Sequence, residues 1–179
     1  METYEQKKRR LFGKLNYLSQ YLNELNRLVK NTNIQNHLIS LIETDNIQFL
    51  DETKWIKLTM PFPIKRQYLC EIIPIFEQNS DTGFYLITEF SKDCGALFIE
   101  SLVNFNSDFE FKDEHSGLII IIDKDISKKL LLDFYESNDG NLIIEVEIYG
   151  SICESILNRI SITLQRKNDV LIETNFLLN

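Results

Sequence analysis

Apolar residues recur at helical spacing in the first part of the chain. Steps of four and three residues separate them, which predicts an amphipathic helix that ends near Asn31. The positions are Leu11, Leu15, Leu18, Leu22, Leu25 and Val29. Thr32 and Gln35 match a capping box, which predicts a second helix that runs to about Thr44. Because the connection is short, residues 1–44 are predicted to form an antiparallel helical hairpin.

The pattern changes to extended segments after Asp45. Turn-forming residues separate stretches that are apolar, β-branched or alternating, which predicts strands at 47–50, 55–60, 68–76 and 84–90. Pro74 indicates that the segment 68–76 is an edge strand or contains a bulge, because proline has no backbone N–H to donate to a neighbouring strand. Residues 96–103 fit a strand or a short helix, and residues 104–116 are predicted to form an exposed acidic loop.

Residues 117–149 form the clearest predicted unit. Residues 118–122 are apolar without alternation, which is typical of a strand that is covered on both faces. Apolar residues at i, i+4 and i+8 then predict a helix over 126–135, and residues 142–149 alternate as a strand. Together these elements predict a right-handed β-α-β crossover.

A β-hairpin is the alternative for this unit. It would turn through Asn138, Asp139 and Gly140, since Asp-Gly is a strong hairpin turn. The remaining chain is predicted to form a short helix at 151–157 and a final hairpin from 160–166 and 170–178.

These elements predict one α+β domain over residues 1–179. A helical hairpin, 1–44, packs on a sheet-rich core, 45–179, whose sheet is mixed and mostly antiparallel with one β-α-β crossover. A chain of 179 residues can bury roughly 70% of its unfolded surface, so the fold needs no disulfide or metal.

The cysteines and the apolar runs predict a soluble cytoplasmic protein. Three cysteines are widely spaced and form no C-x-x-C motif, as expected for free thiols in a reducing compartment. No secretory signal is recognisable, and the longest aliphatic run, 118–122, is far too short to span a bilayer. We therefore expect no membrane association, no cofactor and no structural metal.

Negative charge is concentrated in the second half of the chain. The net charge is −8, yet residues 1–60 carry +2, and residues 71–154 hold 18 acidic residues against 5 basic ones. An acidic surface repels nucleic acid and anionic lipid, and it steers a basic partner toward it. The predicted partner-binding residues are Asp108, Glu110, Asp113 and Glu114 in the acidic loop, with Glu145 and Glu147 on the polar face of a strand.

Evidence for catalysis is weak by comparison. Asp123 and Asp125 resemble paired acids that hold a divalent cation at a strand end, but aspartate there is also a good helix cap. Neither His37 nor His115 has motif partners for a catalytic triad. A metal-dependent enzyme that uses Asp123 and Asp125 is therefore the third hypothesis.

The favoured interpretation is a non-enzymatic module that captures and blocks a basic protein partner. Immunity or antitoxin-type inhibitors of cationic toxins act in this way, and the similarity is one of properties only. The runner-up is an oligomerisation or regulatory module that self-associates through the apolar seam of residues 11–29.

Overall fold

The computed structural model describes residues 2–30, 33–48, 53–78, 80, 83–111, 117–164 and 170–175. The strands in these ranges form a seven-stranded antiparallel sheet in the order β3-β2-β4-β5-β6-β1-β7. Their bounds are Trp55–Pro61 for β1, Phe84–Thr88 for β2, Leu97–Ile99 for β3, Leu118–Asp123 for β4, Lys128–Glu136 for β5, Leu142–Gly150 for β6 and Leu171–Thr174 for β7.

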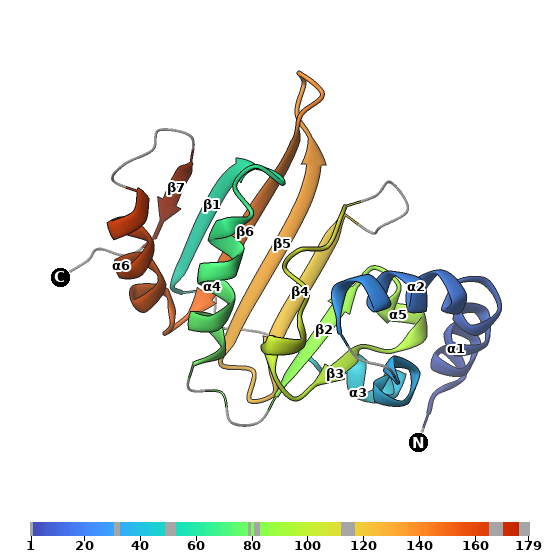
Figure 1. The fold of residues 1–179 in the computed structure, drawn as a ribbon. Coiled ribbons are helices and arrows are strands. Elements are labelled where there is room, and N and C mark those ends of the chain that lie inside the picture. Colours follow the sequence, from blue (N-terminus) through green and yellow to red (C-terminus); the bar gives the residue numbers. More distant parts are fainter. Residues whose placement is uncertain are drawn as a thin grey trace.

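Helices accompany this sheet mainly on one side. Figure 1 shows α2, α4 and α6 in front of the strands, with α1, α3 and α5 grouped beside β2 and β3. The bounds are Tyr4–Asn16 for α1, Leu18–Leu28 for α2, Leu41–Asp45 for α3, Gln67–Glu77 for α4, Ser91–Cys94 for α5 and Cys153–Leu164 for α6, with 3-10 turns at Ile34–His37 and Leu102–Asn104. This arrangement confirms the predicted α+β class. Among the described helices, none has the length and apolar character that crossing a bilayer demands.

The face of the sheet that meets α4 and α6 forms the hydrophobic core. Every second side chain of the long strands is buried there, as the two-residue period of a strand requires. These residues are Ile56, Leu58 and Met60 of β1, Leu130, Leu132 and Phe134 of β5, and Ile144, Val146 and Ile148 of β6. They share one buried cluster with apolar residues of α2, α4 and α6.

The predicted β-α-β crossover is wrong. Residues 128–136 form β5, which runs antiparallel to both β4 and β6. The chain reverses between β5 and β6 with Gly140 at φ 74°, as in the hairpin alternative. The helical interpretation failed because residues four positions apart lie on the same face of a strand, whose side chains alternate with a period of two, as well as on the same face of a helix. Leu130 and Phe134 therefore share a face in a strand as well as in a helix.

The segment predicted as the third strand is helix α4, so that prediction is also wrong. Its buried positions are 68, 69, 72, 73 and 76, which is helical spacing and not alternation. Pro74 lies on the exposed side of α4, where the loss of one helical hydrogen bond costs less than it would in the core.

The N-terminal helices are shorter than predicted. The helix expected over residues 11–29 is divided at Tyr17 into α1 and α2, and the expected second helix is replaced by a 3-10 turn and α3. Ser40 and Glu43 form the capping box of α3. The box predicted from Thr32 and Gln35 involves Thr32, which lies outside the described residues.

Other boundaries differ locally. Residues 47–48 are not in a strand, and residues 49–50 lie outside the described ranges. Helix α6 runs to Leu164, beyond the expected end at 157, and β7 pairs with β1 in place of the predicted C-terminal hairpin.

Gly13 lies where α1 contacts α5. A Cβ atom at Gly13 would lie 2.3 Å from the carbonyl oxygen of Asp93, far inside contact distance. We expect Gly13→Ala to lower the free energy of unfolding by about 1–3 kcal/mol through overpacking, although alanine by itself favours a helix by about 1 kcal/mol. Denaturant unfolding measures the difference, with the exposed Lys14→Ala as the control. A Gly13→Ala protein more stable than the wild type would contradict this contact.

Candidate functional site

The second face of the sheet carries the candidate functional site, which we call the open face. Its side chains alternate with the core residues. Figure 1 shows α4 and α6 on one side of the sheet, so the open face is the side that these helices do not cover. The side chains of the open face are half-buried or exposed, whereas most of the alternate positions are buried. Two rows of the open face contain Ile87, Leu118, Ile120, Leu131, Asp133, Glu145, Glu147, Lys57, Thr59, Leu171 and Glu173, and a third row contains Lys129, Tyr149 and Trp55.

Strand register aligns the side chains of the first two rows across the sheet. One row runs Ile87, Ile120, Leu131, Glu147, Lys57, Glu173, and the next runs Leu118, Asp133, Glu145, Thr59, Leu171. The β2 and β4 positions in these rows are apolar, and the charged residues come from β5, β6, β1 and β7. The open face therefore has an apolar half beside an acidic half.

Four carboxylates surround one ammonium group in the acidic half. Lys57 Nζ forms an ion pair with Glu145 and lies 3.7 Å from Glu147 Oε1. Glu173 is opposite Lys57 in the β1–β7 register, and Asp133 is opposite Glu145 in the β5–β6 register. We call Asp133, Glu145, Glu147 and Glu173 the carboxylate cluster. Lys129 is a second cation on this face: its Nζ lies 4.0 Å from the ring centroid of Tyr149. Four negative charges against the two positive charges of Lys57 and Lys129 leave a net charge of −2.

Two tyrosines orient the central carboxylates. Tyr135 Oη donates a hydrogen bond of 3.0 Å to Glu145 Oε1, and Tyr149 Oη donates one of 2.5 Å to Glu147 Oε2. Each carboxylate thus accepts a hydrogen bond from a neutral tyrosine in addition to its interaction with Lys57. Each side chain is still about one fifth exposed (20% for Glu145, 23% for Glu147). Glu145 and Glu147 are therefore held in a fixed geometry that a partner can reach.

Burial, hydrogen bonds and neighbouring charges together shift the pKa values in and around the cluster. Desolvation, followed by the charges of Glu145 and Glu147, raises the pKa of Asp133. The hydrogen bond to Glu145 raises the pKa of Lys57, and the neighbouring glutamates add to this effect. Burial and the hydrogen bond to Glu145 raise the pKa of the Tyr135 hydroxyl. The charges of neighbouring carboxylates contribute to all three shifts.

Asp133→Asn is expected to stabilise the protein at pH 7. It removes a negative charge directly opposite Glu145, and such like-charge pairs destabilise a sheet, here by about 0.5 kcal/mol. Because the pKa of Asp133 is raised in the folded state, its penalty is fully present above that pKa. The penalty disappears as pH falls toward the unfolded value of about 4. Denaturant unfolding at pH 7 and pH 4 should show a gain that shrinks in acid. A loss of stability at pH 7 would contradict the repulsion.

The structure brings together only some of the predicted binding residues. Glu145 and Glu147 lie side by side on the open face, as expected from their alternation in the sequence. Asp108 and Glu110 are exposed elsewhere: they flank Phe109, which is buried in the core, and Asp108 Oδ1 lies 3.3 Å from Arg66 Nε. The other two predicted loop acids, Asp113 and Glu114, and also His115, lie outside the described residues.

Three members of the site were missed from the sequence. Asp133 was placed on a predicted helix, so its position opposite Glu145 was not foreseen. Lys57 and Glu173 join the site only through the pairing of β1 with β6 and β7, which are far apart in the chain. If residues 128–136 had been interpreted as a strand, the alternation of their side chains would have placed Asp133 on the same face as Leu131.

Asp123 has a structural role at the β4–β5 turn. Its carboxylate accepts hydrogen bonds from Ser127 N (2.8 Å), Ser127 Oγ (2.6 Å) and Lys128 N (2.9 Å), and the residue is 2% exposed. Asp125 is exposed. Over the described part of the chain, no group of three potential metal ligands is assembled.

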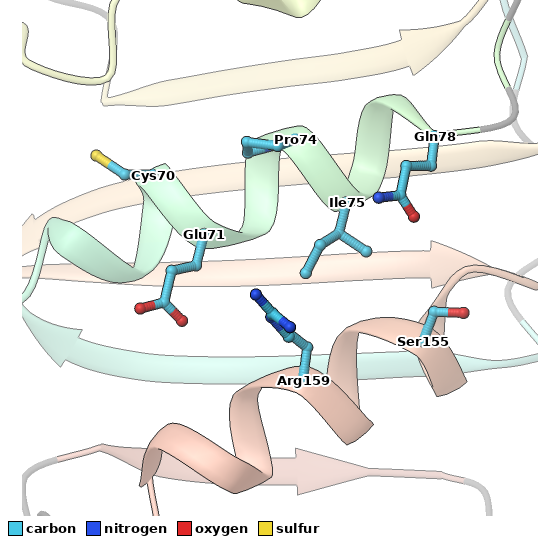
Figure 2. A pocket seen from close by; sticks show the side chains of 7 residues that line it. All are labelled: Cys70, Glu71, Pro74, Ile75, Gln78, Ser155 and Arg159. Carbon is cyan, nitrogen blue, oxygen red and sulfur yellow. The ribbon is translucent and has the colours of Figure 1, made fainter.

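A groove separates α4 from α6. It has a volume of about 500 Å³, and Figure 2 shows Cys70, Glu71, Pro74, Ile75, Gln78, Ser155 and Arg159 along it. Cys70 Sγ lies 3.3 Å from Ser107 Oγ, an arrangement that supplies no general base. Figure 2 shows Glu71 on one wall of the groove and Arg159 on the other, so these two charges balance, whereas the open face has an excess of carboxylates.

Comparison with protein-family models, curated protein sequences and solved structures finds no match to this chain.

Proposed function

We propose that this protein is a non-enzymatic binding module that captures and blocks a basic protein partner through its open face. The proposed class is an immunity or antitoxin-type inhibitor of a cationic toxin that acts in the cytoplasm. Carboxylates of the cluster would occupy the cationic cleft of the partner and exclude its anionic substrate.

The observation that carries this proposal is the excess of negative charge in the carboxylate cluster. Asp133 faces Glu145 across β5 and β6, although like charges in that position lower stability. Sequences break such local rules most often where function requires it. A partner that brings lysine or arginine to the cluster would relieve the repulsion, so the energy is recovered on binding.

The apolar half supports a protein partner over a small cation. Ile87, Ile120 and Leu131 continue the row that contains Glu147 and Lys57, so charged and apolar contacts are adjacent. Protein interfaces combine an apolar centre with charged positions that set orientation and association rate. A basic segment with one apolar side would match both halves.

Other observations weigh against catalysis. Burial raises the pKa of the Cys94 thiol to about 11 and that of Cys153 to about 12, so both thiols are poor nucleophiles at neutral pH. The carboxylate of Asp123 is engaged by its own turn. These features favour binding over the metal-dependent enzyme that uses Asp123 and Asp125.

Self-association through residues 11–29 has limited support. Leu25 and Val29 are buried within the chain, which leaves Leu11 and Leu15 as the exposed members of that seam. A symmetric contact between two α1 helices would also bring their basic residues together.

Capture followed by inhibition tests the proposal. The immobilised protein is incubated with extract, and a bound protein is identified, purified and assayed with and without the binder. We expect a partner with a pI above about 9 that salt elutes and that loses activity at a stoichiometric ratio. Failure of any basic protein to bind, or binding without inhibition, would contradict the proposal.

A further inference from the structure

Helix α1 presents an apolar stripe to solvent. Tyr4, Leu11 and Leu15 are 78%, 55% and 83% exposed. At 100° per residue these three positions fall within about 40° of one another on the helix. Gly13, which packs against Asp93, lies on roughly the opposite side. The stripe therefore points away from the protein body.

Lysines border this stripe on both sides. Helical geometry places Lys7 and Lys14 along one side and Lys8 along the other. The two arginines of α1 are engaged elsewhere, Arg9 with Asp45 and Arg10 with Glu2. Within the described residues, the three lysines form no ion pair, so their charges are available to a partner.

An apolar stripe between lysines fits an anionic lipid surface. Interfacial helices bury a shallow apolar face at the headgroup boundary and place lysine or arginine beside anionic headgroups. Figure 1 places α1 at one end of the molecule, whereas β1 and β7, which carry part of the carboxylate cluster, lie at the other end. Because charges separated by more than about 8 Å are largely screened at physiological salt, the net charge of −8 does not prevent this contact.

We propose that α1 docks on anionic membrane surfaces, with Tyr4, Leu11 and Leu15 at the interface and Lys7, Lys8 and Lys14 at the headgroups. The association is peripheral and reversible, since one short stripe and three lysines bind weakly. This proposal departs from the expectation of no membrane association, which rested on the apolar runs and the acidic surface and did not consider the stripe of α1. The contact is independent of the open face and leaves the carboxylate cluster accessible. It would hold the binder near a membrane surface.

Vesicle sedimentation tests this proposal with the full chain. Vesicles of phosphatidylcholine alone are compared with vesicles that contain about one third phosphatidylglycerol. We expect sedimentation with the anionic vesicles only, and loss of binding when salt is raised from about 0.1 M to about 0.5 M. A Leu11→Ser/Leu15→Ser variant and a Lys7→Gln/Lys8→Gln/Lys14→Gln variant should each bind about tenfold less.

Matched controls separate the stripe from general surface effects. Val103→Ser changes another exposed apolar residue, 76% exposed, and Lys124→Gln changes another exposed lysine; both should bind like the wild type. Equal binding to both vesicle types, or unchanged binding of the α1 variants, would overturn the proposal. Light scattering tests whether the stripe binds a second copy of the chain instead. If the wild type forms dimers that the Leu11→Ser/Leu15→Ser variant does not form, and the wild type does not bind vesicles, the membrane proposal is also overturned.

Discussion

Replacement of Lys57 by glutamine is expected to destabilise the protein and to tighten its binding to a basic partner. Lys57 forms ion pairs with Glu145 and Glu147, so its loss removes one positive charge from among the four carboxylates of the cluster. We expect the free energy of unfolding at pH 7 to fall by about 1–2 kcal/mol as a charged hydrogen bond and its ion pairs are lost. Denaturant unfolding measures this change.

The effect on binding has the opposite sign. Lys57 competes with a partner's lysine or arginine for Glu145 and Glu147, so the variant should bind a basic partner about three- to tenfold more tightly at low salt. The pKa of Lys57 is raised in the folded state, so its stabilising effect is fully present below the unfolded value of about 10.4. That effect is lost as pH rises through the folded value. The wild type and the variant should therefore converge in stability at strongly alkaline pH. Weaker partner binding by the variant would show that Lys57 itself contacts the partner.

Asp123→Ala is expected to cause the largest loss of stability. The substitution leaves the amides of Ser127 and Lys128 without the acceptor that they now share, and both Asp123 and Lys128 are buried. Loss of such buried partners costs about 2–4 kcal/mol. The same turn holds Ile126 at φ 55°, a conformation that a β-branched residue rarely adopts, so the bonds to Asp123 also offset local strain. Thermal and denaturant unfolding measure the loss.

Asp125→Ala is the matched control for this turn. Asp125 is exposed, and its replacement should cost well under 1 kcal/mol. If the two aspartates formed a metal site, calcium, magnesium or manganese would raise the melting temperature of the wild type, and each substitution would abolish that rise. We expect no such rise. If the Asp123→Ala variant were as stable as the Asp125→Ala variant, the structural role of Asp123 would be contradicted.

The α+β class and the polar face of β6 could be predicted from the sequence because each rests on local periodicity. Glu145 and Glu147 alternate with Ile144, Val146 and Ile148, and no other spacing fits that segment. Residues 126–135 were misassigned because apolar steps of four satisfy a helix and a strand equally. Only pairing with β4 and β6 decides between the two.

The composition of the site could not be predicted for a different reason. The contacts of Lys57 with Glu145 and Glu147 join β1 to β6 across nearly half of the chain, and Glu173 comes from a third distant strand. Strand order depends on packing of the whole chain, which local patterns do not encode. The charge count of residues 71–154 therefore indicated an acidic surface but not its location.

A comparison of two charge-matched variants tests the central claim most directly. Glu145→Gln/Glu147→Gln and Asp108→Asn/Glu110→Gln each remove two negative charges, the first from the open face and the second from the segment around Phe109. Binding of the purified partner is measured by titration calorimetry at several salt concentrations. We predict at least about tenfold weaker binding and a reduced salt dependence for the first variant, and less than about a twofold change for the second. Equal losses in both variants, or a loss only in the second, would contradict the assignment of the open face as the binding site.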